Sequence, residues 1–443
     1  MAQAIPAGAP PHAARLPALS DHRVARFAAI MVLYFLQGIP WGLATVAIPA
    51  WLAMNGATPV AVGVFVATAV LPWSLKPLNG VLMDRFTYKP MGRRRAWILG
   101  AQALMLCSLL TLALLQPGPA EISLLAALCF TLNFSATLND VAIDGMAVDI
   151  VPDDERTAVN SCMFASQAAG VAATGAIAGL VMSVGGLQAL ALVLAVLVAA
   201  ASVFVSLFRE RSGERLLPWS NGQASPECIE RQQDAFLPIL KGMFGALIKP
   251  TTLVFLLACA MSQATFALVD GVAPTLAVQA LGWTSDGYSN FAAIVSLAAA
   301  AAGLTLPPLI MRMIGMRATI IGICLGLAAL AGIGGAMFGQ GDASLAFQVL
   351  ITLQSSLAIV MQITVIVWAM KICSPAIAAS LFAVFMSVPN LGRTILIGWS
   401  GPVIETGGYP DVYFAVAGFS VLAALLFAFA RVGDNRLLAE AAA

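Results

Sequence analysis

Twelve long apolar runs follow one another along this sequence, and each approaches or exceeds the roughly 20 residues that a helix needs to cross a bilayer. Only 10% of the residues are charged, whereas a soluble domain usually carries about 25%. Because unpaired backbone groups are costly in lipid, the runs are predicted to be helices of an all-α polytopic membrane protein. We place the twelve transmembrane helices at 27–50, 59–83, 96–116, 122–150, 156–184, 186–208, 251–280, 287–311, 317–339, 344–371, 375–399 and 410–432.

Basic residues are distributed unevenly between the connecting loops. All but two of the 22 Lys and Arg residues lie in the two tails or in loops after even-numbered runs, whereas loops after odd-numbered runs carry acids such as Glu121 and Asp286. Since basic loops stay in the cytoplasm, we expect a multi-pass protein of the inner (plasma) membrane with both termini cytoplasmic. The two exceptions, Lys76 and Arg393, lie inside predicted helices.

A long charged connection after the sixth run divides the chain into two halves. We expect a cytoplasmic tail at 1–26, a six-helix bundle at 27–208, a cytoplasmic linker at 209–250, a second six-helix bundle at 251–432 and a tail at 433–443. Both halves carry Gly and Arg residues around the end of their second run, which indicates a weak internal repeat. Pseudo-symmetric halves predict alternating access, with a binding site between them at mid-membrane.

The connection after the second run carries a recognisable pattern, consisting of Gly80, Asp84, Arg85, Gly92, Arg93, Arg94 and Arg95. It resembles the loop signature of the major facilitator superfamily. Three further segments resemble the AmpG-type permeases and their acetyl-CoA transporter relatives: Phe35-Leu-Gln-Gly-Ile-Pro40-Trp41, Leu75-Lys76-Pro77 and Asn139-Asp140-Val-Ala-Ile-Asp144. The resemblance implies an importer, of anhydro-muropeptides with protons in AmpG members and of siderophores or acyl-CoA in related permeases. The signature residues, together with Asp149, are expected to form a conformational gate.

Five charged residues lie well inside predicted helices, away from the helix ends, where charge is costly and commonly marks function. They are Lys76, Asp140, Asp144, Asp270 and Arg393. Counting about 1.5 Å per residue places the first three in the inner half of the membrane and the last two in the outer half. Lys76 is therefore predicted to pair with Asp140 or Asp144, and Asp270 with Arg393. We assign all five to proton coupling and ion pairing, with Asp270 as the better proton carrier.

Other roles for these charges stay open at this point. The pairs could be purely structural, or Lys76 and Arg393 could bind an anionic substrate, since Arg suits carboxylate and phosphate groups. Polar side chains at helical spacing on the first, fourth, seventh and tenth runs, which the resemblance places around a central cavity, add candidates for substrate binding. With one residue of the eleventh run, these are Tyr34, Gln37, Trp41, Asn133, Gln263, Gln362 and Asn390. Alternatively, such residues only link helices.

Several classes of function lack support in the sequence. The seven cysteines show no metal or redox spacing, and the only histidines, His12 and His22, precede the first run. We therefore expect no enzyme activity, no metal, no cofactor beyond a proton gradient and no nucleic-acid partner, but a small-molecule substrate, a lipid bilayer and a monomer.

The predicted function is proton-coupled secondary transport that imports a polar or anionic solute resembling an amino sugar or muropeptide. A siderophore or acyl-CoA permease, an exporter of the same fold and a signalling protein without transport are the alternatives.

Overall fold

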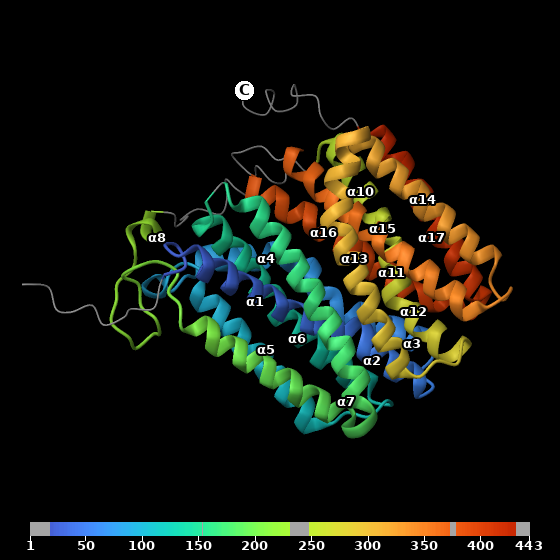
Figure 1. The fold of residues 1–443 in the computed structure, drawn as a ribbon, viewed down its shortest axis with the longest axis horizontal. Coiled ribbons are helices and arrows are strands. Elements are labelled where there is room, and N and C mark those ends of the chain that lie inside the picture. The colour runs from blue at the N-terminus through green and yellow to red at the C-terminus, as the bar shows by residue number, and fades with distance from the viewer. Residues whose placement is uncertain (1–17, 153, 231–247, 373–377, 431–443) are drawn as a thin grey trace, which may run out of the picture.

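The computed structural model describes residues 18–152, 154–230, 248–372 and 378–430, and most of this described chain is helical (Figure 1). Ten helical stretches in it are long and apolar enough to cross a membrane. One of them lies within α7 (Arg156–Ser206), where Gly186 has the non-helical φ of 62° and separates two helices. With this division and the 30-residue α16 (Ala378–Gly407), the helices fit the predicted count of twelve.

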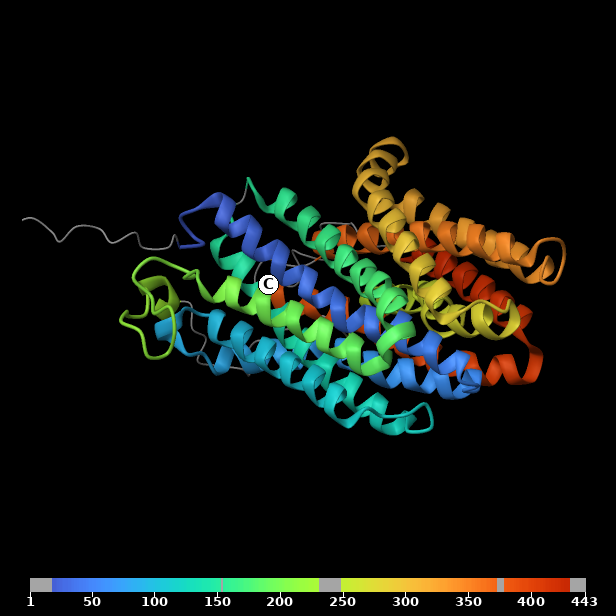
Figure 2. The ribbon, with the colours of Figure 1, turned by 60° about the horizontal axis from the view of Figure 1, so that its bottom comes forward.

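The first half is built from α1 to α7. Its first membrane helix joins α1 (Arg23–Gly42), the π turn η1 (Leu43–Ala47) and α2 (Ile48–Met54). The second joins α3 (Pro59–Val70), the 3-10 turn η2 (Leu71–Leu75) and α4 (Lys76–Arg85). The 3-10 turn η3 (Lys89–Met91), α5 (Arg95–Leu115), α6 (Ile122–Ile150) and α7 follow. Figure 2 shows α1 and α7, in blue and green, lying side by side.

The second half begins after the short helix α8 (Pro226–Glu230). Its first membrane helix joins α10 (Pro250–Ser262), α11 (Ala264–Gly271), α12 (Ala273–Thr275) and a second π turn, η4 (Leu276–Ala280). It continues through α13 (Ser285–Ile314), α14 (Met316–Ala336), α15 (Ala343–Ile372), α16 and α17 (Tyr409–Phe429). The first membrane helix of each half therefore contains a π turn, inside the helix in the first half and at its end in the second.

Several helix ends differ from the predicted limits for local reasons. The first helix begins at Arg23 instead of residue 27, because Nδ1 of His22 accepts a hydrogen bond from Ala25 N at 3.3 Å and caps it. Arg26 is buried and donates to Glu155 at 2.6 Å, so the predicted tail boundary at residue 26 falls inside α1. The predicted limits of the fourth run, 122–150, coincide with α6.

The two ends of the bundle are held together differently. We call the end that carries Arg23, Glu155 and Gly92–Arg95 the basic end, and the end that carries Met54, Ala57 and Gln279 the opposite end. At the basic end, the ion pairs described join parts of the first half to one another, such as Arg26 to Glu155 and Arg93 to Asp149.

At the opposite end the two halves pack directly against each other. Gln279, in η4, donates from Nε2 to the carbonyl oxygens of Ala53 at 2.9 Å and Ala57 at 2.7 Å. Apolar residues of α2 and of the second half form one buried cluster around this contact, including Ala50 and Val272. Figure 1 shows α2 and α3 close to α12 on the right. The halves are therefore closed against each other at the opposite end.

Two further contacts between the halves run along pairs of helices, α3 with α16 and α7 with α13. Glycine allows the close approach in both. A Cβ at Gly401 would lie 2.4 Å from Val60 Cα, and one at Gly175 would lie 2.8 Å from the carbonyl oxygen of Ser289.

Candidate functional site

An ion pair inside the first half joins Lys76 and Asp140. Lys76 Nζ lies 2.5 Å from Asp140 Oδ2, with both side chains largely buried. Lys76 is the first residue of α4, directly after the tight turn η2, and its ammonium lies 4.7 Å from the ring centroid of Trp73 within that turn. Of the two partners that the sequence left open for Lys76, the structure brings it to Asp140.

Asp144, one helical turn along α6 from Asp140, has a different partner. The hydroxyl of Tyr34, on α1, donates a hydrogen bond to Asp144 Oδ1. The Asp144 side chain is exposed, whereas Asp140 is buried. Within the described residues, no cation forms an ion pair with Asp144. This carboxyl therefore has a hydrogen-bond donor and an exposed face, but no ion-pair partner among the described residues.

A second ion pair lies in the second half, between Asp270 on α11 and Arg393 on α16. Asp270 Oδ2 accepts hydrogen bonds from Arg393 Nε, at 2.7 Å, and from Nη2. The guanidinium lies between two rings, 4.4 Å from the centroid of Trp41 and 4.6 Å from that of Phe266. Phe266 belongs to the same half, but Trp41 belongs to α1. A side chain of the first half therefore contacts the ion pair of the second.

Trp41 and Trp73 form an aromatic contact between the two ion pairs, with ring centroids 5.2 Å apart and an interplanar angle of 86°. Trp73 also donates from Nε1 to Asn133 Oδ1 at 3.0 Å. We call these two residues the tryptophan pair. The sequence singled out Trp41 and missed Trp73, which stands in an apolar run. The available signal was its spacing of three residues from Lys76, which puts both on one helical face.

The other predicted substrate-binding residues differ in their burial and in their hydrogen-bond partners. Asn133 and Gln37 are fully buried, and each hydrogen-bonds to another residue of the bundle. Asn133 Nδ2 donates to Cys129 O at 3.0 Å, and Gln37 Oε1 accepts from Gln167 at 3.3 Å. Asn390 donates to the carbonyl of Trp73 at 3.4 Å and so connects the two halves. Gln263 is buried and Gln362 is half-buried.

The predicted gate residues gather at the basic end. Gly92 adopts φ of 93° and turns the chain into α5, while Arg93 Nη1 lies 3.4 Å from Asp149 Oδ2. Arg94 packs against Gly145, because a Cβ at Gly145 would lie 2.6 Å from Nε of Arg94. Arg95 donates a hydrogen bond to Ser206 O at 2.6 Å. Gly80 and Arg85 lie on α4, and the side chain of Asp84 is outside the described part.

Two buried carboxyls of the linker, Glu210 and Glu214, complete this end. Glu210 Oε2 accepts from Arg94 N at 3.1 Å, and Glu214 Oε1 accepts from Ser225 Oγ at 2.7 Å. A Cβ at Gly92 would lie 2.5 Å from Glu210 Oε2, so the carboxyls and the gate loop pack in direct contact. Burial and the neighbouring Glu210 carboxylate raise the pKa of Glu214 to about 7. The sequence treated this linker as a polar connection and missed both.

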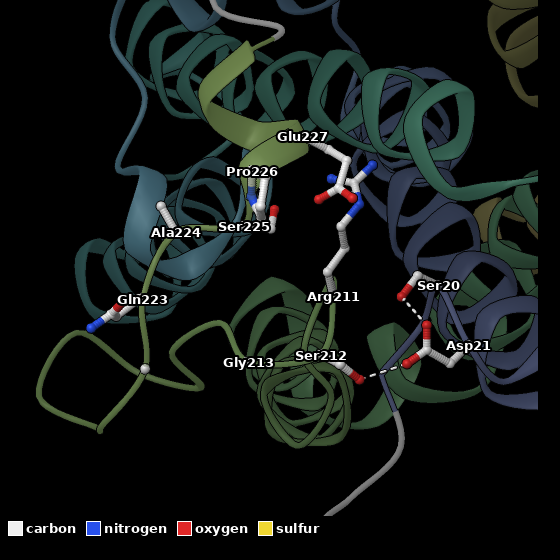
Figure 3. A pocket seen from close by; sticks show the side chains of 11 residues that line it. Ser20, Asp21, Arg211, Ser212, Gly213, Gln223, Ala224, Ser225, Pro226 and Glu227 are labelled. Carbon is white, nitrogen blue, oxygen red and sulfur yellow. Dashed lines mark hydrogen bonds between the residues drawn. The ribbon is translucent and has the colours of Figure 1, made fainter.

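An open cavity of about 760 Å³ lies beside these carboxyls, away from the embedded ion pairs (Figure 3). Its lining includes Asp21, Arg211 and Glu227, and Figure 3 shows the last two pointing toward one another. Ser212 Oγ donates to Asp21 Oδ2 at 2.5 Å, which joins the linker to the segment before α1.

Comparison with known proteins identifies the family. The sequence model of the Major Facilitator Superfamily matches residues 30–397. The chain belongs to this superfamily. The resemblance inferred from the loop signature is confirmed, and the chain is a multi-pass membrane transporter rather than an enzyme.

Relatives within the superfamily include AmpG-type proteins. The chain is 31% identical over 133 residues to the anhydromuropeptide permease of Escherichia coli (strain K12), a match that covers 30% of this chain and 27% of that protein. It is 23% identical over 412 residues to the putative transporter AmpG 4 of Rickettsia felis, covering 89% of this chain and 93% of the relative.

Solved structures of the superfamily share the fold. A D-xylose-proton symporter superposes with a TM-score of 0.69 at 14% identity, covering 91% of this chain and 97% of that one. The nucleoside transporter NupG gives 0.65 at 16% identity, covering 91% and 98%. At these identities the likeness establishes the architecture of a Major Facilitator Superfamily protein.

Proposed function

We propose that this transporter imports an anionic, muropeptide-like solute together with protons, by alternating access between its two halves. The name of the E. coli relative supports the substrate class. The two embedded cations support an anionic group on the substrate, because Lys76 and Arg393 suit carboxylates and phosphates. Both cations also lie on aromatic rings, which suits a substrate with a sugar ring.

The orientation follows from the positive residues. Basic segments stay in the cytoplasm, so we assign the basic end, with both termini, to the cytoplasmic side of the inner membrane. The halves are closed against each other at the opposite end, where Gln279 contacts Ala53 and Ala57. The closed opposite end supports our assignment of this structure to the inward-facing state of an alternating-access carrier.

Asp144 carries the proposal of proton coupling. Three embedded carboxyls accompany two embedded cations, so one negative charge is left over when all five are ionised. Asp140 and Asp270 have cationic partners, whereas Asp144 has the hydroxyl of Tyr34. A single proton on Asp144 would make the group neutral. The sequence favoured Asp270 as the proton carrier, and the compensation of Asp270 by Arg393 now favours Asp144.

Exposure of Asp144 supports release of the proton toward the cytoplasm in this state. Burying a neutral carboxyl in the low-dielectric interior costs less than burying a carboxylate. Protonation of Asp144 therefore lowers the cost of a change of state that buries this side chain. Transport then requires that the substrate and the proton bind the outward-facing and inward-facing states with different affinities. The anionic group of the substrate would compete with Asp270 or Asp140 for the embedded cations.

Uptake of labelled anhydromuropeptide into proteoliposomes tests the proposal. With an acidic exterior, wild-type protein should accumulate the label, and an uncoupler should abolish accumulation. Asp144→Asn should lose accumulation while it keeps exchange of external for internal label, which needs no net proton movement. Glu405→Gln, which changes an exposed acid of the opposite end, is the matched control.

Wild-type accumulation that ignores the pH gradient and the uncoupler would refute proton coupling. Accumulation only under the reversed gradient would identify an exporter. A siderophore and an acyl-CoA, offered to the same vesicles, test the two other substrate classes.

A further inference from the structure

We propose that Trp73 is a positioning residue that couples the two embedded ion pairs, so that Lys76–Asp140 and Asp270–Arg393 respond together when the transporter changes state. The inference rests on the proposed function only where it refers to transport. The contacts of Trp73 carry it, because this one residue contacts Lys76 directly and is linked to Arg393 through Trp41 and to α16 through Asn390.

Toward the first ion pair, Trp73 contacts both helices that carry the partners. Its ring lies under the Lys76 ammonium at 4.7 Å, and its Nε1 donates to Asn133 on α6 at 3.0 Å. Asn133 lies seven residues before Asp140 on that helix, so both share one face. The indole is 5% exposed, which leaves it little freedom to turn. Trp73 therefore sets the position of the Lys76 ammonium relative to the Asp140 carboxylate.

Toward the second ion pair, Trp73 makes two separate contacts. Its ring meets Trp41 edge to face at 5.2 Å, and Trp41 in turn lies 4.4 Å from the Arg393 guanidinium. Its carbonyl oxygen accepts from Asn390 Nδ2 at 3.4 Å. Asn390 and Arg393 are three residues apart on α16 and lie on the same side of the helix. A movement of α16 therefore reaches Trp73 through a ring contact and through a hydrogen bond.

The local backbone makes Trp73 sensitive to such a movement. It stands in the 3-10 turn η2, between Pro72 and Pro77, where α3 passes into α4. A stretch of 3-10 helix inside a long helix often marks a hinge. A cation over an indole is attracted only within about 6 Å of the ring centroid. A backbone movement at this hinge would therefore carry the indole with it and change the environment of Lys76 directly.

A double-mutant cycle on the conformational equilibrium tests the coupling without any substrate. Spin labels at Ala120→Cys and Gln340→Cys, both exposed at the opposite end and one in each half, report the ratio of outward-facing to inward-facing protein. Accessible native cysteines are replaced by Ser in the full-length chain. The ratio is measured for Asp140→Asn, for Asp270→Asn and for the double variant, with Trp73 intact and with Trp73 replaced.

With Trp73 intact, the double variant should depart from the product of the two single effects by about fivefold or more, as expected for residues that interact through a shared partner. With Trp73→Leu the departure should fall below about twofold. Trp73→Phe keeps an aromatic ring and should preserve the coupling. Trp399→Leu, which removes an exposed Trp of α16, is the matched control and should preserve it as well.

Additive effects with Trp73 intact, or fivefold coupling retained in Trp73→Leu, would overturn the proposal. If Trp73→Leu does not reach the membrane, Trp73→Met replaces it with the same two outcomes. The result is separable from the proposed function, because the labels report coupling whether or not anhydromuropeptide is taken up. Coupling without uptake would reject the substrate class alone.

Discussion

The two halves of this transporter carry embedded charge in different ways. In the second half, Asp270 and Arg393 neutralise each other, and two aromatic rings enclose the guanidinium. In the first half, Lys76 neutralises Asp140, and a further carboxyl, Asp144, remains exposed with a hydroxyl as its partner. The second half therefore holds a closed pair, whereas the first half holds an extra carboxyl that can gain and lose a proton.

This difference suggests a division of labour between the halves. A compensated pair between aromatic rings is suited to recognising an anionic group, which can exchange places with Asp270. An exposed carboxyl without a cation is suited to exchanging protons with water. The four experiments below test whether the halves differ in this way, beginning with the largest expected effect.

Arg393→Leu should have the most severe effect. It leaves Asp270 buried without a cation, and breaking a buried pair in this way costs about 3–5 kcal/mol. We expect a clear loss of thermal stability and an uptake at least about 100-fold lower, consistent with the loss of roughly 3 kcal/mol of substrate binding. The double variant Arg393→Leu with Asp270→Leu should recover most of the stability and none of the uptake. A double variant as unstable as the single one would show that the pair itself is not the cause.

Lys76→Met should have an intermediate effect. The Lys76 side chain is 14% exposed and therefore less completely desolvated than Arg393, whose side chain is 9% exposed. We expect a stability loss of about 1–3 kcal/mol from the unpaired Asp140, measured by thermal denaturation in detergent. Adding Asp140→Asn should reduce this loss. A loss equal to that of Arg393→Leu would contradict the difference between the two halves.

Asp144→Asn should change function much more than stability. No ion pair is broken in the described structure, and Asn can still accept a hydrogen bond from Tyr34, so we expect a stability change within about 0.5 kcal/mol. Exchange of labelled substrate across the membrane should become independent of pH between 5 and 8. Exchange that keeps the wild-type pH profile would move the proton site to another carboxyl.

Glu214→Gln should have the smallest effect on transport. This variant distinguishes a second pH-sensitive carboxyl, which lies in the linker after the first half, from Asp144. With a pKa of about 7 in the folded protein, against about 4.3 for an unperturbed Glu, Glu214 binds its proton more tightly when folded. Its contribution to stability is therefore complete below about pH 4.3 and is lost as the pH rises through 7. Protection of the linker against hydrogen exchange, corrected for the intrinsic rate, should fall from pH 6 to pH 8.

In Glu214→Gln this protection should be constant over the same range, and uptake should stay near the wild-type level. Glu227→Gln, an exposed acid beside the same cavity, should keep the wild-type dependence on pH. A wild-type pH dependence retained in Glu214→Gln would show that Glu214 is not the group responsible.

The architecture could be predicted because it depends on patterns along the chain. Charge is so unfavourable in lipid that the long apolar runs and the five embedded charges stand out without any knowledge of contacts. Depth counting along α4 and α6 sufficed to bring Lys76 near Asp140, because a helix has a fixed rise per residue. The predicted fourth run coincides with α6 for the same reason.

The missed features depend on side-chain directions between helices. The choice of Asp140 over Asp144 as the partner of Lys76, and the contact of Tyr34 with Asp144, follow from helix rotation, which depth does not determine. Trp73 reads as one more apolar residue in the sequence, and only its contacts with Trp41 and Lys76 in the structure show that it lies beside the ion pairs. Glu210 and Glu214 looked like solvated linker residues, because nothing in a loop sequence reveals that it folds back and becomes buried.

The π turns η1 and η4 lie in the first membrane helix of each half. At the opposite end, η1 directly precedes α2, and η4 itself carries Gln279. A π turn holds an additional residue compared with an α-helical turn. That residue can move along a helix by exchanging one hydrogen bond at a time, and each residue that the π turn passes rotates by about 100° about the helix axis. Such rotation would carry Gln279 out of reach of the Ala53 carbonyl while the helix stays wound. The opposite end can then separate by twisting, with no need to unfold or to bend a whole helix.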